Sequence, residues 1–284
     1  MGNQSVKKQE RIRTLFQALF VVVTNGYAQG FVQGRIFQGA SKEVCVPGLN
    51  CYSCPGALGS CPIGAMQAVA GERSFTLPLY VTGFLMVAGA FFGRLVCGWM
   101  CPFGLFQDLL YKIPFPKKLQ QVKGDRFLRY FKYLILGLFV LILPMFWAGD
   151  FGQSDPWFCK YICPSGTLMA GWPLVLLSEG LRGALGFLFV WKSVILIVLI
   201  VLSLALYRPF CRYICPLGAI YGLFNKVSFR RYHVDKSKCT SCRSCAQICR
   251  LCIDPAKTPN SAECIRCGRC VKACKTGALR SVIK

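Results

Sequence analysis

The sequence predicts a mainly α-helical, integral membrane fold in which a four-transmembrane-helix, internally duplicated core is followed by a small α+β domain. Of the 284 residues 54% are hydrophobic, which is too apolar for an ordinary soluble protein. A cysteine–proline phrase, CPxG, recurs at 61–64, 101–104, 163–166 and 215–218. Near residue 231 the apolar runs stop, so we expect a membrane domain over 1–230 and a cytoplasmic domain over 231–284.

Four stretches are apolar over about the 20 residues that a helix needs to cross a membrane. They cover residues 15–37, 74–93, 133–149 and 193–207, the last extended back through 187–190. Lys192 interrupts the last stretch but can snorkel toward the membrane surface. Gln17, Gln29 and Gln33 give the first stretch a polar stripe. Such a stripe either bonds to neighbouring helices or lines a pocket for a quinone head group, and both interpretations stay open.

The distribution of lysine and arginine orients these spans. Four precede the first span, eight lie in 94–132 and sixteen in 208–284, against two in 38–73 and three in 150–192. Because positive residues collect in cytoplasmic loops, both termini are expected in the cytoplasm. Membrane topology therefore explains the formal net charge of +23 more simply than binding to nucleic acid does.

The four CPxG phrases alternate across this topology. CPIG at 61 and CPSG at 163 fall on the outer side, whereas CPFG at 101 and CPLG at 215 fall on the inner side. The order of span, outer phrase, span and inner phrase then occurs twice, which predicts an internal duplication. Parallel repeats are related by an axis along the membrane normal. We therefore expect the two inner phrases to meet each other, and the two outer phrases likewise.

The nineteen cysteines indicate metal ligation, because disulfide frameworks belong mainly to small secreted proteins. Two C-x2-C-x2-C-x3-C runs, at 239–249 and 264–274, predict a bacterial two-4Fe-4S ferredoxin-like domain. In that pattern the fourth cysteine of each run ligates the other cluster. The expected ligands are Cys239, Cys242, Cys245 and Cys274 for one 4Fe-4S cluster, and Cys264, Cys267, Cys270 and Cys249 for the other. Cys252 is an additional thiol that could replace Cys249.

The C-x3-C-P phrases of the inner side predict a further cluster. Proline favours the first position of a helix, which makes the preceding cysteine the N-cap residue and points the positive end of the helix at whatever the thiolate binds. Two such phrases supply the four thiolates that one cube needs. The predicted inner ligands are Cys97, Cys101, Cys211 and Cys215. Arg94, Arg208 and Arg212 stand beside them, either to offset cluster charge or to bind lipid head groups.

The outer side offers more cysteines than one cluster needs. The candidates are Cys51, Cys54, Cys61, Cys159 and Cys163, with Cys45 beside them. Cys61, Cys163 and Cys159 belong to CPxG phrases, whereas the fourth ligand is either Cys51 or Cys54. Cys45 and the remaining thiol could form a disulfide on an oxidising side, or six ligands could support a different cluster. Inert buried cysteines that only cap helices are the alternative for every phrase, and fourfold repetition argues against it.

These motifs resemble those of a known family. CGWMCP and CRYICP on the inner side, together with the spans and the C-terminal ferredoxin runs, look like the NapH-type quinol dehydrogenases associated with periplasmic nitrate reductase. The membrane cores of NosR-type and PceC-type proteins are similar. The resemblance implies a prokaryotic cytoplasmic membrane, quinol as electron donor, periplasmic redox partners and sometimes a partner-bound flavin. The outer cysteines exceed the two C-x3-C-P phrases of the nitrate-associated proteins, which favours a route through the membrane.

The leading hypothesis is therefore a membrane-integral iron–sulfur electron-transfer subunit. It would pass electrons between a cytoplasmic donor and a membrane or extracytoplasmic acceptor through 4Fe-4S clusters, two in the ferredoxin domain and two in the membrane domain. The first alternative is a NapH-like quinol dehydrogenase that feeds a periplasmic redox enzyme, and the second is a non-catalytic membrane anchor or assembly factor. Expected partners are other subunits of a redox complex, soluble ferredoxin or quinone, and membrane lipid, but not nucleic acid.

Overall fold

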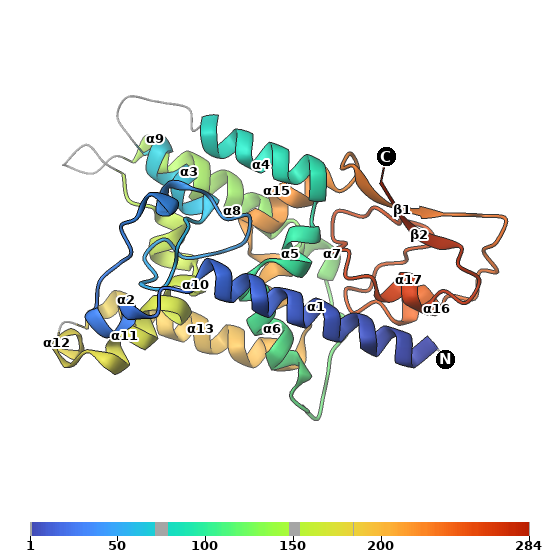
Figure 1. Ribbon diagram of the computed structural model, residues 1–284, viewed down its shortest axis with the longest axis horizontal. Helices are drawn as coiled ribbons and strands as arrows, with labels where there is room; N and C mark the ends of the chain where they lie inside the picture. The colour runs from blue at the N-terminus through green and yellow to red at the C-terminus, as the bar shows by residue number, and fades with distance from the viewer. Residues whose placement is uncertain (1, 72–78, 148–153, 184, 284) are drawn as a thin grey trace.

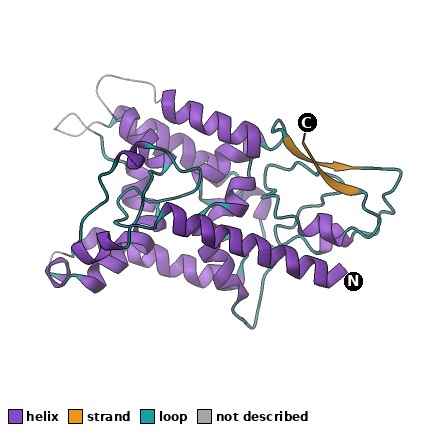
Figure 2. Cartoon of the chain, viewed as in Figure 1, coloured by secondary structure: helices purple, strands orange, loops and turns teal. Residues whose placement is uncertain are grey.

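The computed structural model of the chain describes residues 2–71, 79–147, 154–183 and 185–283. The longer helices run roughly along the long axis of the molecule, and a small domain with a two-stranded sheet forms one end, beside the N-terminus (Figures 1 and 2). The expectation of a mainly helical fold that ends in a small α+β unit is confirmed.

Helix α1 (Gly2–Thr24) contacts both the helical core and the small domain. Its buried face carries Val6, Arg13 and Gln17, each at most 3% exposed. Its opposite face exposes Leu15, Leu19, Val22 and Val23. An apolar face of this kind needs lipid or a partner as its surroundings.

The predicted span over 15–37 is wrong, because α1 ends at Thr24. The Thr24 hydroxyl donates to the carbonyl of Phe20 at 2.8 Å. Side-chain bonds to the preceding turn bend a helix and compete with its continuation. Within residues 25–37 the short helix α2 (Gln29–Gln33) is the only helix, and both of its glutamines are exposed. The stripe that begins at buried Gln17 therefore does not continue along one helix face.

Three further apolar helical stretches contribute buried residues to the helical core. They are α4 (Leu79–Phe92), α13 (Phe187–Ala205) and a stretch made of α7 (Asp125–Leu128), α8 (Phe131–Ile135), the π-helix η2 (Leu136–Ile142) and α9 (Leu143–Phe146). Among the described residues, two helical stretches, Asp125–Phe146 and Phe187–Ala205, are long and apolar enough to cross a membrane. Only 22% and 17%, respectively, of an apolar 18-residue window in each is buried. Residues 74–78 and 148–149 of the predicted spans lie outside the described residues.

Each CPxG phrase begins a helix in the same way. The helices are α3 (Pro62–Ala70), α6 (Pro102–Lys112), α10 (Pro164–Gly166) and α15 (Pro216–Phe224). In all four the proline is the first helical residue, and the cysteine before it has extended backbone angles, with φ from −76° to −66° and ψ from 114° to 127°. The predicted proline start and cysteine N-cap are confirmed at every phrase.

Short helical turns carry the first cysteine of each C-x3-C-P phrase. These are α5 (Leu95–Trp99), the π-helix η3 (Phe158–Ile162) and α14 (Pro209–Tyr213). The remaining short helices are the 3-10 helix η1 (Ala40–Glu43), the π-helix η4 (Thr167–Gly171), α11 (Trp172–Leu177) and α12 (Glu179–Arg182). In each phrase the chain therefore folds one helical turn, breaks, and restarts a helix at the proline.

The C-terminal domain is closed by strands from its two ends. Strand β1 (Arg230–Val234) pairs antiparallel with β2 (Leu279–Ile283), with Arg230 opposite Ile283 and Val234 opposite Leu279. Between them lie the short helices α16 (Ser244–Gln247) and α17 (Arg269–Ala273), and α1 packs along α17. The two cysteine runs are thereby folded into one unit beside the helical core.

A buried carboxylate, Asp108 of α6, holds three segments together. Arg208 donates to it through Nε at 2.7 Å and Nη2 at 2.5 Å, and Nη2 of Arg13 lies 2.9 Å from Oδ2. All three residues are at most 2% exposed. Burial alone would raise the pKa of Asp108, but the two arginines outweigh burial and hold that pKa below its ordinary value. The charged carboxylate therefore links α1, α6 and the turn before α14.

Replacement of Asp108 by asparagine should lower the free energy of unfolding by about 3–5 kcal/mol, because two arginines would remain buried without their counter-charge. The matched control is Asp155→Asn, which breaks a partly exposed pair with Lys160 and should cost at most about 1 kcal/mol. Denaturant unfolding of the purified protein measures both. Equal stabilities of the two variants would contradict the proposed role of Asp108.

Candidate iron–sulfur centres

The four inner cysteines predicted from the sequence meet inside the helical core. Cys97 and Cys211 lie on α5 and α14, and Cys101 and Cys215 are the N-cap residues of α6 and α15. All four are at most 6% exposed and belong to one buried cluster. Burial raises the pKa of Cys97 and of Cys211 to about 11. Thiolates at such a place need a metal or another cation to be stable.

Two arginines cross between the halves of this group. Arg94 precedes Cys97 by three residues and donates through Nη2 to the carbonyl of Cys211 at 2.8 Å. Arg208 precedes Cys211 by the same interval and donates through Nη1 to the carbonyl of Cys97 at 2.5 Å. Each half therefore fixes the first cysteine of the other half. In the sequence each arginine belongs to a pattern that both inner phrases share, R-x-x-C-x-x-x-C-P-x-G.

The crossing explains the glycine of the inner phrases. A Cβ on Gly104 would lie 3.2 Å from Nη1 of Arg208, and one on Gly218 would lie 3.1 Å from Nη2 of Arg94. Both distances are tighter than ordinary van der Waals contact, so a side chain would push against the guanidinium. Glycine is therefore the residue that leaves room for the arginine of the opposite half.

The arginines beside the inner cysteines do not face lipid head groups. Arg94, Arg208 and Arg212 are at most 1% exposed. Arg94 pairs with Glu263 at 2.8 Å and Arg212 with Asp125 at 2.7 Å, while Arg208 pairs with the carboxylate of α6. The lipid interpretation is therefore wrong for these three residues, because no head group reaches a guanidinium buried inside the core.

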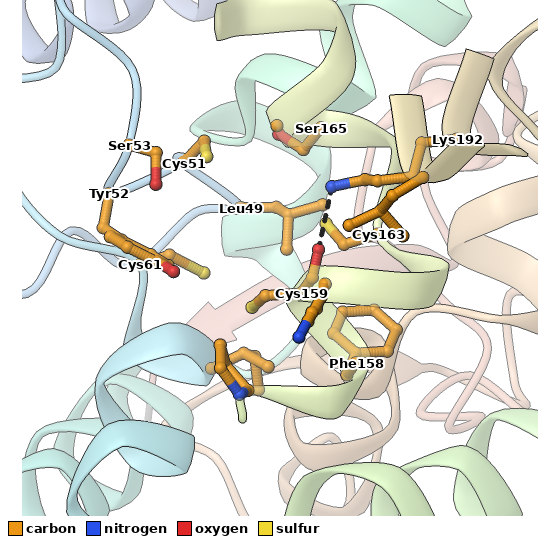
Figure 3. Close-up of a pocket in the computed structure, with 15 residues that line it drawn as sticks. Leu49, Cys51, Tyr52, Ser53, Cys61, Phe158, Cys159, Cys163, Ser165 and Lys192 are labelled. Atoms are coloured by element: carbon orange, nitrogen blue, oxygen red, sulfur yellow. Dashed lines mark hydrogen bonds between the residues drawn. The ribbon is translucent and has the colours of Figure 1, made fainter. Parts of the chain in front are cut away.

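The outer cysteines form a second group. Cys51, Cys61, Cys159 and Cys163 line one cavity of about 320 Å³ (Figure 3). They come from the loop before α3, the N-cap of α3, the helix η3 and the N-cap of α10. Lys192 of α13 extends into the same cavity and donates to the carbonyl of Cys159 at 3.0 Å. Four thiols thus surround a single space, and Lys160 and Lys192 also belong to its lining.

The structure separates Cys51 from Cys54, between which the sequence left the choice open. Cys51 lines the cavity, whereas Cys54 is absent from its lining and its thiol donates to the carbonyl of Met169 at 3.2 Å. Cys45 is buried, and its backbone forms an isolated parallel β-bridge with Ser60, the residue before the first CPxG phrase. All of these cysteines are free, and the suggested disulfide of Cys45 is not formed. Cys51 is therefore the residue that completes the outer group of four.

The number of cysteines in each group suits a 4Fe-4S cluster, which needs four thiolate ligands. Among the described residues, no group of three or more histidine, cysteine, aspartate or glutamate side chains is found that could hold a single metal ion. Four thiols beside cationic side chains fit an anionic 4Fe-4S cluster in number and in charge.

The ferredoxin cysteines group as the crossed pattern predicts. Cys239, Cys242, Cys245 and Cys274 line a cavity of about 450 Å³, and Cys249, Cys264, Cys267 and Cys270 line a smaller one. Cys242 is exposed, and hydrogen bonding with Ser244 lowers its pKa to about 7. The first ferredoxin group therefore lies near solvent. Cys252 turns away from both cavities, and its thiol donates to the carbonyl of Gln120 at 3.2 Å.

The second ferredoxin group lies directly against the inner group. A Cβ on Gly98, next to Cys97, would lie only 2.4 Å from the carbonyl oxygen of Ile265. Trp99 donates through Nε1 to the carbonyl of Arg266 at 3.2 Å. Ile265 stands between two cysteines of the second group and belongs to the buried cluster of the inner cysteines. Glycine at position 98 therefore allows the two backbones to touch.

The loop before α3 contacts the inner group as well as the outer group. The side chain of Leu49 lines the outer cavity. Burial raises the pKa of Cys101, and hydrogen bonds from the backbone of Leu49 and Gly104 oppose that rise. A Cβ on Gly48 would lie 3.1 Å from Cα of Cys101. The loop before α3 therefore touches both groups, a contact that no spacing in the sequence indicates.

Comparison with known proteins agrees with these groups. A family model described as a 4Fe-4S binding domain matches residues 74–123, 133–177 and 184–234, and a second model of the same description matches 258–280. Each of the first three matches contains one C-x3-C-P phrase. No solved structure matches the chain.

Several curated proteins are similar over most of the chain. An uncharacterised protein of Methanocaldococcus jannaschii is 32% identical over 218 residues, which cover 74% of this chain and 73% of that protein. The ferredoxin-type protein NapH of Escherichia coli is 27% identical over 75% of this chain and 71% of its own length. The methylamine utilization ferredoxin-type protein MauN of Methylorubrum extorquens is 30% identical over 68% of this chain and 58% of its own length.

Removal of one inner ligand should abolish one set of signals. Cys101→Ala or Cys215→Ala should each remove the electron paramagnetic resonance signal of the inner centre, because each takes away one of its four thiolates. The two ferredoxin centres should keep their signals, since none of their cysteines is changed. If both variants retained every signal of the unaltered protein, the assignment of these ligands would be wrong.

Cys51 and Cys54 provide a matched pair for the outer centre. Cys51→Ala should lower the iron content by about four atoms per chain, because it removes a ligand of one cube. Cys54→Ala, three residues away, should leave the iron content unchanged, because its thiol bonds to a carbonyl outside the cavity. Iron analysis of the anaerobically purified proteins compares the two. The opposite result would assign Cys54 to the centre.

Proposed function

This chain belongs to the NapH-type family of 4Fe-4S ferredoxin proteins and is an iron–sulfur electron-transfer subunit, and from this premise we propose that it passes electrons along its long axis through four centres. The two ferredoxin groups receive or deliver electrons at a cytoplasmic partner. The inner and outer groups connect them to a membrane or extracytoplasmic acceptor. The chain acts as one subunit of a membrane redox complex.

The continuous succession of the four cysteine groups carries this proposal. The first and second ferredoxin groups belong to the small domain with α16 and α17, the inner group to α5 and α6, and the outer group to α3 and α10. These elements follow one another from the small domain toward the far end of the helices (Figure 1). Gly98 and Ile265 touch between the second and third groups, and Leu49 lies between the third and fourth. A 4Fe-4S cluster supplies one-electron transfer when bound. The chain supplies the ligands and keeps them in this order.

The membrane arrangement that we propose has four spans and both termini in the cytoplasm. Two helical stretches are long and apolar enough to cross, and α1 and α4 also expose apolar side chains. The N-terminus and the small domain lie at the same end of the molecule (Figure 1). The basic N-terminal segment and the basic domain over 231–284 then share the cytoplasmic side, and residues 1–230 form the membrane body.

One observation favours quinol oxidation as a second candidate function. A groove of about 680 Å³ lies along α1 and is lined by Ile12, Leu15 and Ala18 on its apolar part and by Lys7 and Lys112 on its polar part. Glu10 lines the same groove and pairs with Arg250 and Arg269, which border the second ferredoxin group. An amphipathic groove beside a centre suits a quinol whose head group must approach a one-electron acceptor.

Iron analysis and selective reduction test the proposal. The intact protein should contain about 16 iron atoms per chain, four for each cube. Fewer than about 8 would leave even the ferredoxin domain incomplete and would refute the electron-transfer route. Reduced soluble ferredoxin should reduce all four centres in the absence of quinol. Reduction by quinol alone would instead support the second candidate.

Interruption of the route at the inner centre gives a sharper result. In Cys215→Ala, soluble ferredoxin should still reduce the two ferredoxin centres within the time that the unaltered protein needs. The outer centre should be reduced at least about tenfold more slowly, because the intermediate step is removed. Rapid-freeze paramagnetic resonance follows each centre separately. Unchanged reduction of the outer centre would mean that electrons reach it by another path.

A further inference from the structure

Two buried glutamines occupy the same position in two CPxG helices. Gln67 and Gln107 each follow the phrase cysteine by six residues, in CPIGAMQ and CPFGLFQ. They are at most 1% exposed, although neither belongs to any of the four cysteine groups. An uncharged polar side chain buried this deeply requires hydrogen bonds to offset the loss of water. Their partners therefore indicate why they are there.

Gln107 contacts the inner group through both atoms of its amide. Its Nε2 donates to the sulfur of Cys211 at 3.1 Å, and its Oε1 accepts from the backbone amide of Phe210 at 3.2 Å. Because a backbone amide can only donate, Oε1 must face Phe210 and Nε2 must face the sulfur. The orientation of the donor toward Cys211 is thus fixed by the structure itself and is not an arbitrary choice of amide flip.

Gln67 repeats this arrangement at the outer group. Its Nε2 donates to the sulfur of Cys159 at 3.2 Å, and its Oε1 accepts from the backbone amide of Phe158 at 2.9 Å. As with Cys211, the target is the first cysteine of a C-x3-C-P phrase in the second half of the chain, and the backbone amide belongs to the phenylalanine before it. Gln67 and Gln107 therefore make the same two hydrogen bonds at two separate cysteine groups. This repetition argues that the contacts are not accidental.

The second half of the chain does not supply such donors. Met169 and Tyr221 hold the equivalent positions in CPSGTLM and CPLGAIY. Neither carries an amide, and the hydroxyl of Tyr221 donates to the carbonyl of Pro47 at 3.0 Å. The amide donors therefore come from the first half and act on sulfurs of the second half. A methionine in the same helical position also shows that the fold accommodates an unbranched apolar side chain there.

We propose that Gln107 and Gln67 are positioning residues that hold the sulfurs of Cys211 and Cys159 and raise the reduction potentials of the inner and outer centres, respectively. A donor to a ligating sulfur stabilises the more negative, reduced state more than the oxidised state. The inference rests on the proposed function, because it takes these sulfurs as cluster ligands. Each glutamine acts on one centre only, so the two potentials can be set independently.

Replacement by methionine tests the two effects separately. Gln107→Met should shift the midpoint of the inner centre to a more negative potential, by about tenfold in the reduction equilibrium or about 59 mV for a one-electron couple. Gln67→Met should shift the outer centre alone by a similar amount. Gln33→Met, which changes an exposed glutamine of α2, is the control and should shift neither. Potentiometric titration with full iron content in all three variants gives the comparison.

Outcomes that oppose the inference are distinct from those that oppose the electron-transfer route. Full iron content with unchanged midpoints in both variants would show that the glutamines only support the fold. A shift of both centres by either variant would show a general disturbance. A deficit of iron in the unaltered protein would count against the proposed centres themselves and not against the glutamines.

A measurement on the unaltered protein covers the case in which a variant fails to bind iron. Protein labelled with ¹⁵N in the side-chain amide of glutamine should show a ¹⁵N coupling to the reduced inner and outer centres in pulsed paramagnetic resonance. The ferredoxin centres should show none, because no glutamine side chain bonds to their sulfurs among the described residues. Absence of the coupling at the inner and outer centres would overturn the inference.

Discussion

The structure depends on keeping charged groups paired inside an apolar core. An unpaired buried charge costs several kcal/mol, so each buried cation needs a partner close to it. The chain has only eleven acidic residues against thirty-four lysines and arginines. Three of these acids, Asp108, Asp125 and Glu263, pair with the arginines that border the inner cysteines. Three of the eleven carboxylates are thus placed beside arginines buried in the core, where an unpaired charge would cost most.

This pairing also joins the small domain to the helices. Glu263 belongs to the ferredoxin unit, yet it pairs with Arg94 and Lys132 of the helical core. Burial alone would raise the pKa of Glu263, but Arg94 and Lys132 outweigh burial and lower it, so the carboxylate remains charged. The same segment carries Ile265, whose carbonyl rests against Gly98. The distance between the inner group and its neighbour is thus set by an ion pair and a backbone contact, and no flexible linker intervenes.

The inner and outer groups follow one plan with different cations. In both, a cysteine caps a proline-started helix, and an amide from the first half bonds to a sulfur of the second. Two arginines neutralise the inner group, whereas Lys192 extends into the outer one. An ammonium is a compact, strongly hydrated charge and a guanidinium is a planar fork that bonds several carbonyls. The inner group is therefore tied more tightly to its surroundings, and the outer group retains an open cavity.

The sequence by itself determined the features that arise within a few residues. Proline fixes φ and lacks an amide hydrogen, so the four helix starts with their capping cysteines could be predicted, and the spacing of the C-terminal runs predicted which cysteines would group. Only the folded structure distinguishes Cys51 from Cys54, because the two cysteines have nearly equivalent neighbours in the sequence. The thiol of Cys54 bonds to the carbonyl of Met169, 115 residues away, and so lies outside the cavity. The end of α1 at Thr24 and the hydrogen bond from Arg94 to the carbonyl of Cys211, 117 residues away, are likewise seen only in the folded structure. Local preferences act over one or two helical turns, whereas these choices depend on contacts between the two halves that no short pattern encodes.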